Sequence, residues 1–585
     1  MRRLQWAPLA VCLASIALAQ TSGDTVLRAM RDELDRSRGL KMLALEAPYF
    51  IEYSIEDASS FEAAATLGGL LSVRHDRFRV PEINVRVGGP KFDNTDYLGS
   101  PHAGAHYDIG RFPIENSYEA LRRYLWLETD SAYKGAVEAI ARKRAALKNV
   151  AVSEPLDDFA PAPPLKKLLE VRHVPLDEEA WPARVRSLSA IFEGYPSLLA
   201  SSVQVQAGQS VHYYVNSEGT EVRVPEDLIF LVARADAQAP DGMLVHDAAI
   251  FQALDFGRLP SDAELRRGVT ALAADVTALA GAPRGDEYAG PVLFEGRAAA
   301  QLFAEVLGEN LAPARRPVAD PGRSNFAARE SELQGRRGAR ILPEWMDVVD
   351  DPTQKEWQGR PLFGSYEVDR EGVAPVPLTL VEKGVLKTFL MTRQPMPGLT
   401  GSNGRARLPG AFGANTAAIS NLFVRASETS PAPELKRQLI DICKQRGKPY
   451  GMVVRKLDFP SSASVAEIRR LMGENRQDGG QLVSAPVLAY RVYTDGREEL
   501  VRGLSFRGLD ARSLKDILSA GDDNNVFEFL NNDAPLALIG GARFVAETSV
   551  IAPSVLVDDL DLRPIAEELP KLPIVPPPDL EVSRK

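Results

Sequence analysis

Residues 290–310 read GPVLFEGRAAAQLFAEVLGEN and limit the possible folds of this chain more than any other stretch. The apolar run after Gly290 predicts a short β-strand, Glu295 and Gly296 predict a turn, and the following residues predict a helix. Glu305 and Glu309 are four residues apart, which places both carboxylates on one face of that helix. We therefore expect a strand that leads directly into a helix with two acidic side chains.

This pattern is half of a zinc-peptidase helix. Such a helix needs two imidazoles about one turn apart as metal ligands, and a glutamate that deprotonates the metal-bound water. Glutamates are present in the stretch, but it contains no histidine. The stretch alone leaves open whether the helix holds an active metal site, a site with altered ligands, or a site that has lost its metal.

The charge and the N-terminus narrow the class of protein. A formal net charge of −10 over 585 residues argues against nucleic acid or an anionic membrane surface as the partner. Arg2 and Arg3 precede an apolar run from Leu4 to Leu18, and the following residues predict signal-peptide cleavage after Ala19. The run is short for a membrane anchor, which takes about 20 residues. We expect a periplasmic or secreted protein with no membrane span after cleavage of residues 1–19.

Cysteine usage agrees with a fold that does not depend on disulfides. Cys12 leaves with the predicted signal, so the mature chain keeps only Cys443 and cannot form an intramolecular disulfide. Cys443 lies on a predicted helix, where a buried core thiol is favoured over a nucleophile.

Residues 20–284 are predicted to form an α/β domain with an antiparallel sheet and long helices. Predicted elements are the strands Tyr49–Ile55, Ala64–Val73 and Glu82–Val87, a hairpin of Ser210–Val215 with Thr220–Val224, and helices opened by capping boxes at Asn116/Glu119 and Ser261/Glu264. Pro283, within the segment Gly281–Gly285, marks the expected domain boundary.

Residues 285–569 are predicted to form a second, β-rich domain, and residues 570–585 a Pro-rich tail. The expected fold class is therefore α+β.

Several segments of the chain resemble the TldD/PmbA family of predicted zinc peptidases and their inactive relatives. In chain order these segments are YYVNSEGTEVR, GPVLFEG, GSYEVDREGVAPVPLTLVEKGVLKTFLMTR, SNGRAR, YTDGREELVRG and SVIAPSVLVDDLDL. The resemblance is strongest from about Tyr288 to Pro564. It implies an N-terminal α/β domain and a β-rich C-terminal domain that form dimers around an enclosed chamber.

The resemblance also implies two kinds of subunit. TldD-like subunits carry His-Glu-x-x-x-His on the helix after the GPV strand, with a downstream cysteine as a further zinc ligand. PmbA-like (TldE) subunits lack the motif and can pair with a TldD-like subunit. This chain would then form a homodimer, or a heterodimer with a TldD-like subunit.

Placed on this sequence, the family motif is degenerate. Its first histidine falls on Ala304, its glutamate on Glu305 and its second histidine on Glu309. The family cysteine is expected between the YTDGREELVRG and SVIAPS stretches, but Cys443 precedes both. All the histidines precede the helix: His75, His102, His106, His173, His212 and His246. Zinc belongs to the family, but no metal or other cofactor is expected here. Glu305 keeps the general-base position as a vestige, with both glutamates solvated or paired with an arginine such as Arg297.

Two further sets of residues are candidates for binding. His102 and His106 have ligand-like spacing, but the surrounding Gly and Pro residues favour a loop over a helix. Arg405 and Arg407 could contact a peptide carboxylate, or could form structural salt bridges instead.

The sequence thus predicts an exported TldD/PmbA-like protein with a degenerate metallopeptidase centre, acting as a non-catalytic, PmbA-like subunit or a peptide-binding homologue. One alternative is an active metallopeptidase with an atypical carboxylate site and Glu305 as base. The other is a secreted dimeric scaffold without peptide chemistry.

Overall fold

The computed structural model describes residues 24–41, 46–98, 112–148, 156–319, 331–409, 415–459, 483–531 and 545–565. The predicted cleavage after Ala19, the His102/His106 pair and the tail 570–585 lie outside these residues. The boundary after residue 284 stays a prediction, and it divides the chain into an N-terminal half and a C-terminal half.

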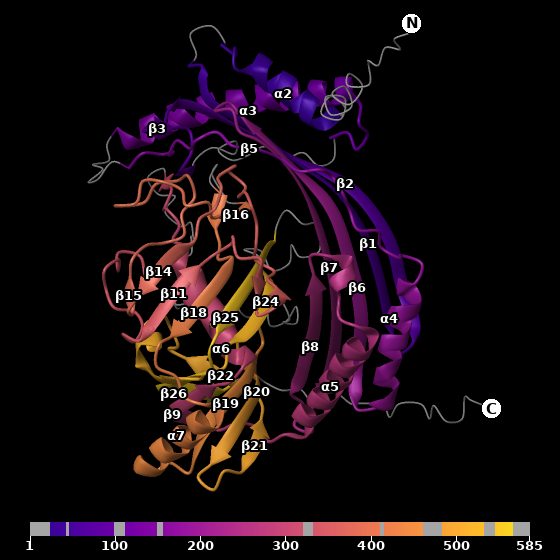
Figure 1. Ribbon diagram of the computed structural model, residues 1–585, viewed down its shortest axis with the longest axis vertical. Coiled ribbons are helices and arrows are strands. Elements are labelled where there is room, and N and C mark those ends of the chain that lie inside the picture. Colours follow the sequence, from indigo (N-terminus) through magenta and orange to yellow (C-terminus); the bar gives the residue numbers. More distant parts are fainter. Residues whose placement is uncertain are drawn as a thin grey trace, which may run out of the picture.

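The N-terminal half is built on one sheet of long strands that curves around the C-terminal half (Figure 1). The strand order is β3-β2-β1-β6-β7-β5, with β8 also beside β7, and only the β5–β7 pair is parallel. The strands are β1 (Pro48–Thr66), β2 (Gly69–Gly89), β3 (Phe92–Asp93), β5 (Lys166–Leu168), β6 (Leu198–Asn216), β7 (Glu221–Gln238) and β8 (Leu244–Ala253).

The β1–β2 hairpin corrects one predicted strand. Ala64–Val73 contains the turn itself, since Leu67 and Gly68 have φ angles of 42° and 70° between paired Thr66 and Gly69. Two consecutive positive φ angles are typical of a two-residue hairpin turn. The turn was predicted as part of a strand because the apolar residues Leu70 and Leu71 follow it closely.

Helices cover the two ends of this sheet. Helices α2 (Thr25–Ser37) and α3 (Tyr118–Leu147) pack at one end, and α4 (Trp181–Ser189) and α5 (Asp262–Gly281) at the other (Figure 1). The predicted cap of α5 is present, with Glu264 accepting the backbone N–H of Ser261 at 2.9 Å. The predicted cap of α3 is wrong by one residue: Ser117 caps the helix, because the Asn116 side chain accepts a hydrogen bond from Arg79 instead.

The C-terminal half contains two larger sheets. Their strand orders are β15-β14-β11-β18-β25-β24 and β21-β20-β19-β9-β26-β22, with β23 also beside β26. Their strands are β9 (Tyr288–Phe294), β11 (Met346–Asp350), β14 (Leu378–Glu382), β15 (Val385–Leu386), β18 (Asn421–Ala426), β19 (Tyr450–Leu457), β20 (Pro486–Tyr493), β21 (Glu498–Val501), β22 (Leu504–Arg507), β23 (Ile517–Ala520), β24 (Asn525–Asn531), β25 (Ala546–Ala552) and β26 (Val555–Pro564).

Shorter strands pair outside these sheets: β4 (Tyr97–Leu98) with β10 (Val318–Ala319), β12 (Glu356–Trp357) with β13 (Arg360–Pro361), and β16 (Ala406–Pro409) with β17 (Asn415–Ala417). The β4–β10 pair joins the two halves of the chain. A mixed fold with a β-rich C-terminal half confirms the predicted fold class.

One helix packs between the two C-terminal sheets, and another covers the outer face of one of them. Helix α6 (Arg297–Leu302) packs against β9 and β19 of one sheet and against β24 and β25 of the other. Helix α7 (Ala432–Gln445) covers the outer face of β9, β19 and β26, where Cys443 packs in the core as predicted. Among the described helices, none is long and apolar enough to span a bilayer.

Candidate functional site

The strand–turn–helix stretch of residues 290–310 folds as a strand and a buried helical run. After β9, Gly296 turns the chain with a φ of 62°, and its N–H donates to the Ser554 hydroxyl at 2.8 Å. Helix α6 then continues as a π-helical turn, η3 (Phe303–Gly308), and a 3-10 turn, η4 (Glu309–Leu311). Short π-helical turns occur frequently at functional sites.

Glu305 is not solvated, contrary to one of the two predicted arrangements. Its residue is 3% exposed, and its Oε1 accepts hydrogen bonds from the backbone N–H and the hydroxyl of Ser484, both at 3.0 Å. Glu309 is half-buried. The helix lies between two sheets, so it has no open face on which Glu305 could be solvated. Ala304, at the neighbouring position, is part of the hydrophobic core.

Arg405 forms a buried structural ion pair. Its Nε donates to Asp350 Oδ1 at 2.6 Å, and neither side chain is exposed. The remaining nitrogens donate to the backbone carbonyls of Asn403, Asp350 and Val376. Because every nitrogen of the guanidinium has a partner within the chain, the geometry favours the salt-bridge alternative over a peptide contact for this residue.

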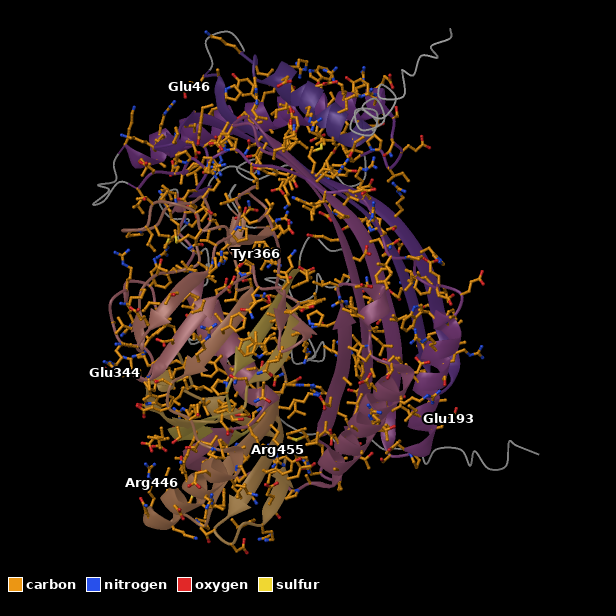
Figure 2. The ribbon with its side chains drawn as sticks, in the orientation of Figure 1. Glu46, Glu193, Glu344, Tyr366, Arg446 and Arg455 are labelled. Atoms are coloured by element: carbon orange, nitrogen blue, oxygen red, sulfur yellow. The ribbon has the colours of Figure 1, made fainter. Side chains whose placement is uncertain are left out.

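Arg407, two residues further, faces a cavity of about 330 Å³ between the two halves of the chain. Its Nη2 donates to the backbone O and Oε2 of Glu547 at 3.2 and 3.1 Å. Its guanidinium carbon lies 4.1 Å from the ring centroid of Tyr366, which Figure 2 places between the long sheet and the C-terminal sheets. Of the two arginines, only Arg407 therefore lies where a ligand could reach it.

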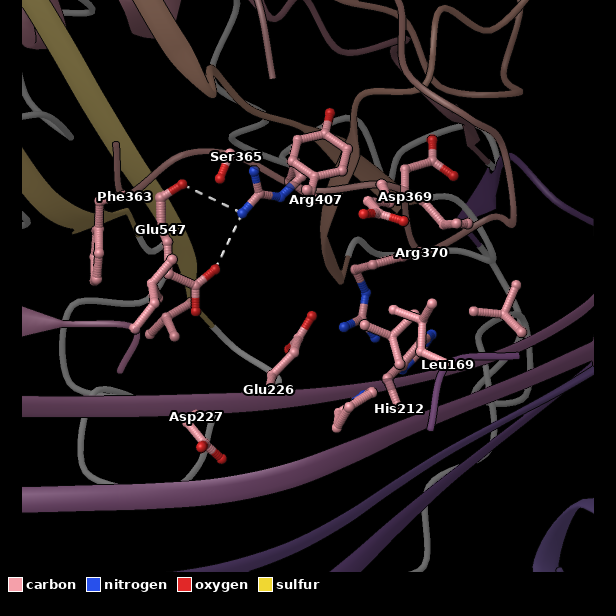
Figure 3. Close-up of a pocket in the computed structure, with 18 of the residues that line it drawn as sticks. Leu169, His212, Glu226, Asp227, Phe363, Ser365, Asp369, Arg370, Arg407 and Glu547 are labelled. Carbon is pink, nitrogen blue, oxygen red and sulfur yellow. Dashed lines mark hydrogen bonds and ion pairs between the residues drawn. The ribbon is translucent and has the colours of Figure 1, made fainter. Parts of the chain in front are cut away.

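Charged side chains from both halves line this cavity (Figure 3). Strands β1, β6 and β7 supply Glu56, His212 and Glu226, while the C-terminal half supplies Asp369, Arg370, Arg407 and Glu547. The cavity lies beside β7 where that strand is paired with neither β5 nor β8, between Arg223 and Ile229. Apolar lining comes from Leu169, Val222, Val224, Leu254, Phe363 and Val545.

The carboxyl groups around the cavity are in unequal environments. Glu56 is buried and accepts from His212 Nδ1 at 3.1 Å, an interaction that holds its pKa low despite the burial. Glu226 is exposed to the cavity, but the surrounding protein keeps part of the water away from its carboxyl group, and this desolvation raises its pKa to about 8 with help from the negative charges of Glu547 and Glu56. Burial also raises the pKa of Asp369 to about 6, although its carboxylate accepts three backbone N–H groups. Perturbed carboxyls that line one cavity are a feature of many binding sites.

Comparison with known proteins agrees with this architecture. Residues 287–563 match the PmbA/TldA metallopeptidase C-terminal domain. The C-terminal half of the chain belongs to the TldD/PmbA family. This match confirms the resemblance inferred from the sequence motifs, and the matched range includes the helix that carries Glu305.

Sequence matches to individual relatives cover only short segments of this chain. A metalloprotease of Archaeoglobus fulgidus is 38% identical over 78 residues, which are 13% of this chain and 17% of that protein. A metalloprotease of Methanothermobacter thermautotrophicus is 40% identical over 65 residues, 11% of this chain and 13% of that protein. These matches thus span less than a fifth of each relative.

Solved structures share the fold over nearly the whole length. TldE from Thermococcus kodakarensis is 14% identical with a TM-score of 0.55, over 92% of this chain and all of that chain. A candidate modulator of a DNA gyrase from Thermotoga maritima is 16% identical with a TM-score of 0.54, over 88% of this chain and 96% of that chain. At these identities the likeness establishes the fold.

The TldD/PmbA motif positions do not fit zinc in this chain. A catalytic zinc takes three protein ligands of the His, Cys or carboxylate type. Ala304 offers no ligand atom, and Glu305 is engaged by Ser484. Within the described ranges, no group of three or more His, Cys, Asp or Glu side chains is arranged to hold a metal ion.

Sequence reasoning missed the carboxyl cluster of the cavity. Glu226 follows Pro225 inside a strand-like run, an interruption that could have marked the position. The cluster itself gives no sequence signal, since its carboxyl groups come from residues 56, 226, 369 and 547, which are far apart in the chain.

Proposed function

We propose that this chain is an exported, non-catalytic member of the TldD/PmbA family that binds peptides. It resembles PmbA-like subunits, and it acts as a homodimer or with a TldD-like partner. The observation that carries this proposal is the Ser484–Glu305 contact. A glutamate whose Oε1 is occupied by a backbone N–H and a hydroxyl, next to an apolar Ala304, is poorly placed to deprotonate a metal-bound water.

Support for the partnered form comes from the fold shared with TldE of Thermococcus kodakarensis. Support for a ligand comes from the cavity between the two halves, whose volume of about 330 Å³ lies at the lower end of the range for small-ligand sites.

The proposal is tested on the purified mature chain, residues 20–585. We expect less than stoichiometric zinc by elemental analysis, no peptidase activity with or without added zinc, and measurable peptide affinity. Stoichiometric zinc together with activity that Glu305→Gln abolishes would establish the atypical metallopeptidase instead. A homodimer with no affinity for any peptide would establish the scaffold.

Glu295→Gln is a matched control, because it shows whether a Glu→Gln change near the helix affects the protein through misfolding. Glu295→Gln alters a glutamate ten residues earlier that pairs with Arg455 outside the core helix. We expect neither Glu295→Gln nor Glu305→Gln to change peptide affinity, because neither residue lines the cavity.

A further inference from the structure

Glu226 is a carboxyl group without a countercharge of its own. Within the described part of the chain it makes no hydrogen bond or ion pair, and its side chain is accessible from the cavity. Figure 3 shows its carboxyl group in the open space beneath Arg407, between Glu547 and Arg370.

The other charged groups around Glu226 have partners elsewhere. Glu56 pairs with His212, Glu547 with Arg407, and Arg370 with Glu82 at 3.4 Å. Asp227 pairs with His173, and Glu367 with Lys167 and Lys355. Glu226 therefore stands as an acceptor that a cationic group entering the cavity could engage.

Arg407 supplies an unused donor on the opposite wall. The residue is 9% exposed, and its Nη2 is taken up by Glu547. Its Nη1 is buried and has no hydrogen-bond partner among the described residues. A buried donor without a partner is unfavourable, and a ligand oxygen that reaches Nη1 from the cavity would relieve that cost.

The two unsatisfied groups differ in what they need. Glu226 needs a cation with N–H donors, and Arg407 Nη1 needs an oxygen acceptor. The carboxyls do not supply a metal cage, since the described residues contain no suitable group of three ligands. A ligand that carries an ammonium beside a carbonyl or carboxylate oxygen satisfies both groups at once.

We propose that the cavity between the two halves binds an α-amino group and its adjacent carbonyl, with Glu226 accepting from the ammonium and Arg407 Nη1 donating to the oxygen. The source of this group is a peptide N-terminus or a free α-amino acid. The apolar side chains of Val222, Val224 and Phe363 line the same cavity and offer a surface for the first side chain of the ligand. The inference rests on the proposed peptide-binding role, but it requires neither zinc nor catalysis.

The probes that test the ligand class are trialanine, N-acetyl-trialanine and free alanine, each titrated calorimetrically into the mature chain. We expect trialanine to bind, and acetylation to weaken binding at least tenfold because it removes the positive charge. Equal binding of both peptides would overturn the amino-group inference and leave peptide binding intact. Binding of alanine without trialanine would support the inference and overturn the peptide-binding role. Absence of binding by all three probes at millimolar concentration would overturn both.

A variant pair locates the site. Glu226→Gln keeps the shape of the side chain but cannot ionise when an ammonium group binds, and should weaken trialanine binding at least tenfold. Glu221→Gln changes a residue of the same strand that pairs with Arg31 and lies outside the cavity. It should leave the affinity unchanged. The thermal midpoint of each variant shows that it is folded, and equal affinity of Glu226→Gln and the unsubstituted chain would overturn the assignment of the site.

Discussion

Ser484 donates both its backbone N–H and its hydroxyl to Glu305 Oε1, each at 3.0 Å, and both residues are buried. The contact ties the π-helical turn to the segment that precedes β20. Two donors on one carboxylate oxygen stabilise its charge in the core. Glu305 thus has a structural role that does not depend on a metal.

The first prediction concerns this contact. Ser484→Ala removes the hydroxyl donor but keeps the backbone N–H, and we expect the free energy of unfolding to fall by about 1–2 kcal/mol. Urea denaturation followed by tryptophan fluorescence measures the change. Ser505→Ala is the control, because the Ser505 hydroxyl makes only a long contact of 3.5 Å at the surface. Equal stability of the two variants would show that the Ser484 hydroxyl contributes nothing.

The second prediction concerns the motif positions. Ala304→His places an imidazole in the core beside Glu305, where Ala304 is 1% exposed. Overpacking of this kind costs about 1–3 kcal/mol. We expect the double variant Ala304→His/Glu309→His to be less stable and to bind no stoichiometric zinc, measured by calorimetry and elemental analysis. A stable, zinc-loaded double variant would mean that the site lacks only its imidazoles.

The third prediction is that the buried ion pair of Arg405 contributes more to stability than an exposed ion pair does. Arg405→Ala leaves the buried Asp350 carboxylate without its partner, and such a change costs about 3–5 kcal/mol. Lys134→Ala breaks the exposed pair with Asp130 and should change stability by less than about 1 kcal/mol. Both are measured by urea denaturation. A stable Arg405→Ala variant with weakened peptide affinity would restore the predicted peptide contact.

The fourth prediction is a pH dependence of the ligand-free chain. The pKa of Glu226 rises from an ordinary value of 4.5 to about 8 on folding. The folded chain therefore holds this proton more tightly than the unfolded chain, so the contribution to stability is complete below pH 4.5 and is lost as the pH rises through about 8. Glu547, Glu56, Arg407, Arg370 and His212 surround the group and set this balance.

We expect the thermal midpoint of the unsubstituted chain to fall between pH 6 and pH 9 by more than that of Glu226→Gln. Calorimetry at both pH values measures the difference between the two proteins, which cancels other titrating groups to first order. Parallel behaviour of the two proteins would mean that Glu226 ionises as it does in water.

The fifth prediction concerns export. Expression of the full sequence in a Gram-negative host should give a periplasmic or secreted protein that begins at Gln20, as N-terminal sequencing and intact mass would show. A cytoplasmic protein that retains residues 1–19 would contradict both the export and the predicted cleavage.

The sequence was sufficient to predict local structure and burial at several positions. The apolar residues before Glu295 predicted strand β9, Ser261 and Glu264 predicted the start of α5, and the apolar spacing around Cys443 predicted a core thiol. Each depends on neighbours within one or two turns of chain, which is the range over which hydrophobic periodicity and capping act. The ordered motifs were sufficient to predict the family and the β-rich C-terminal half.

The environment of the functional residues depended on contacts between distant segments. The residues around Glu305 are apolar on nearly all sides, a pattern typical of a buried helix, but the Ser484 contact joins positions 179 residues apart. The two candidate arginines look equivalent in the sequence. Arg405 is buried in an ion pair with Asp350, whereas Arg407 lines the cavity and its Nη1 has no hydrogen-bond partner among the described residues. The raised pKa of Glu226 arises where the long sheet meets the C-terminal half. Desolvation depends on which atoms surround a group in space, and not on its neighbours in the chain.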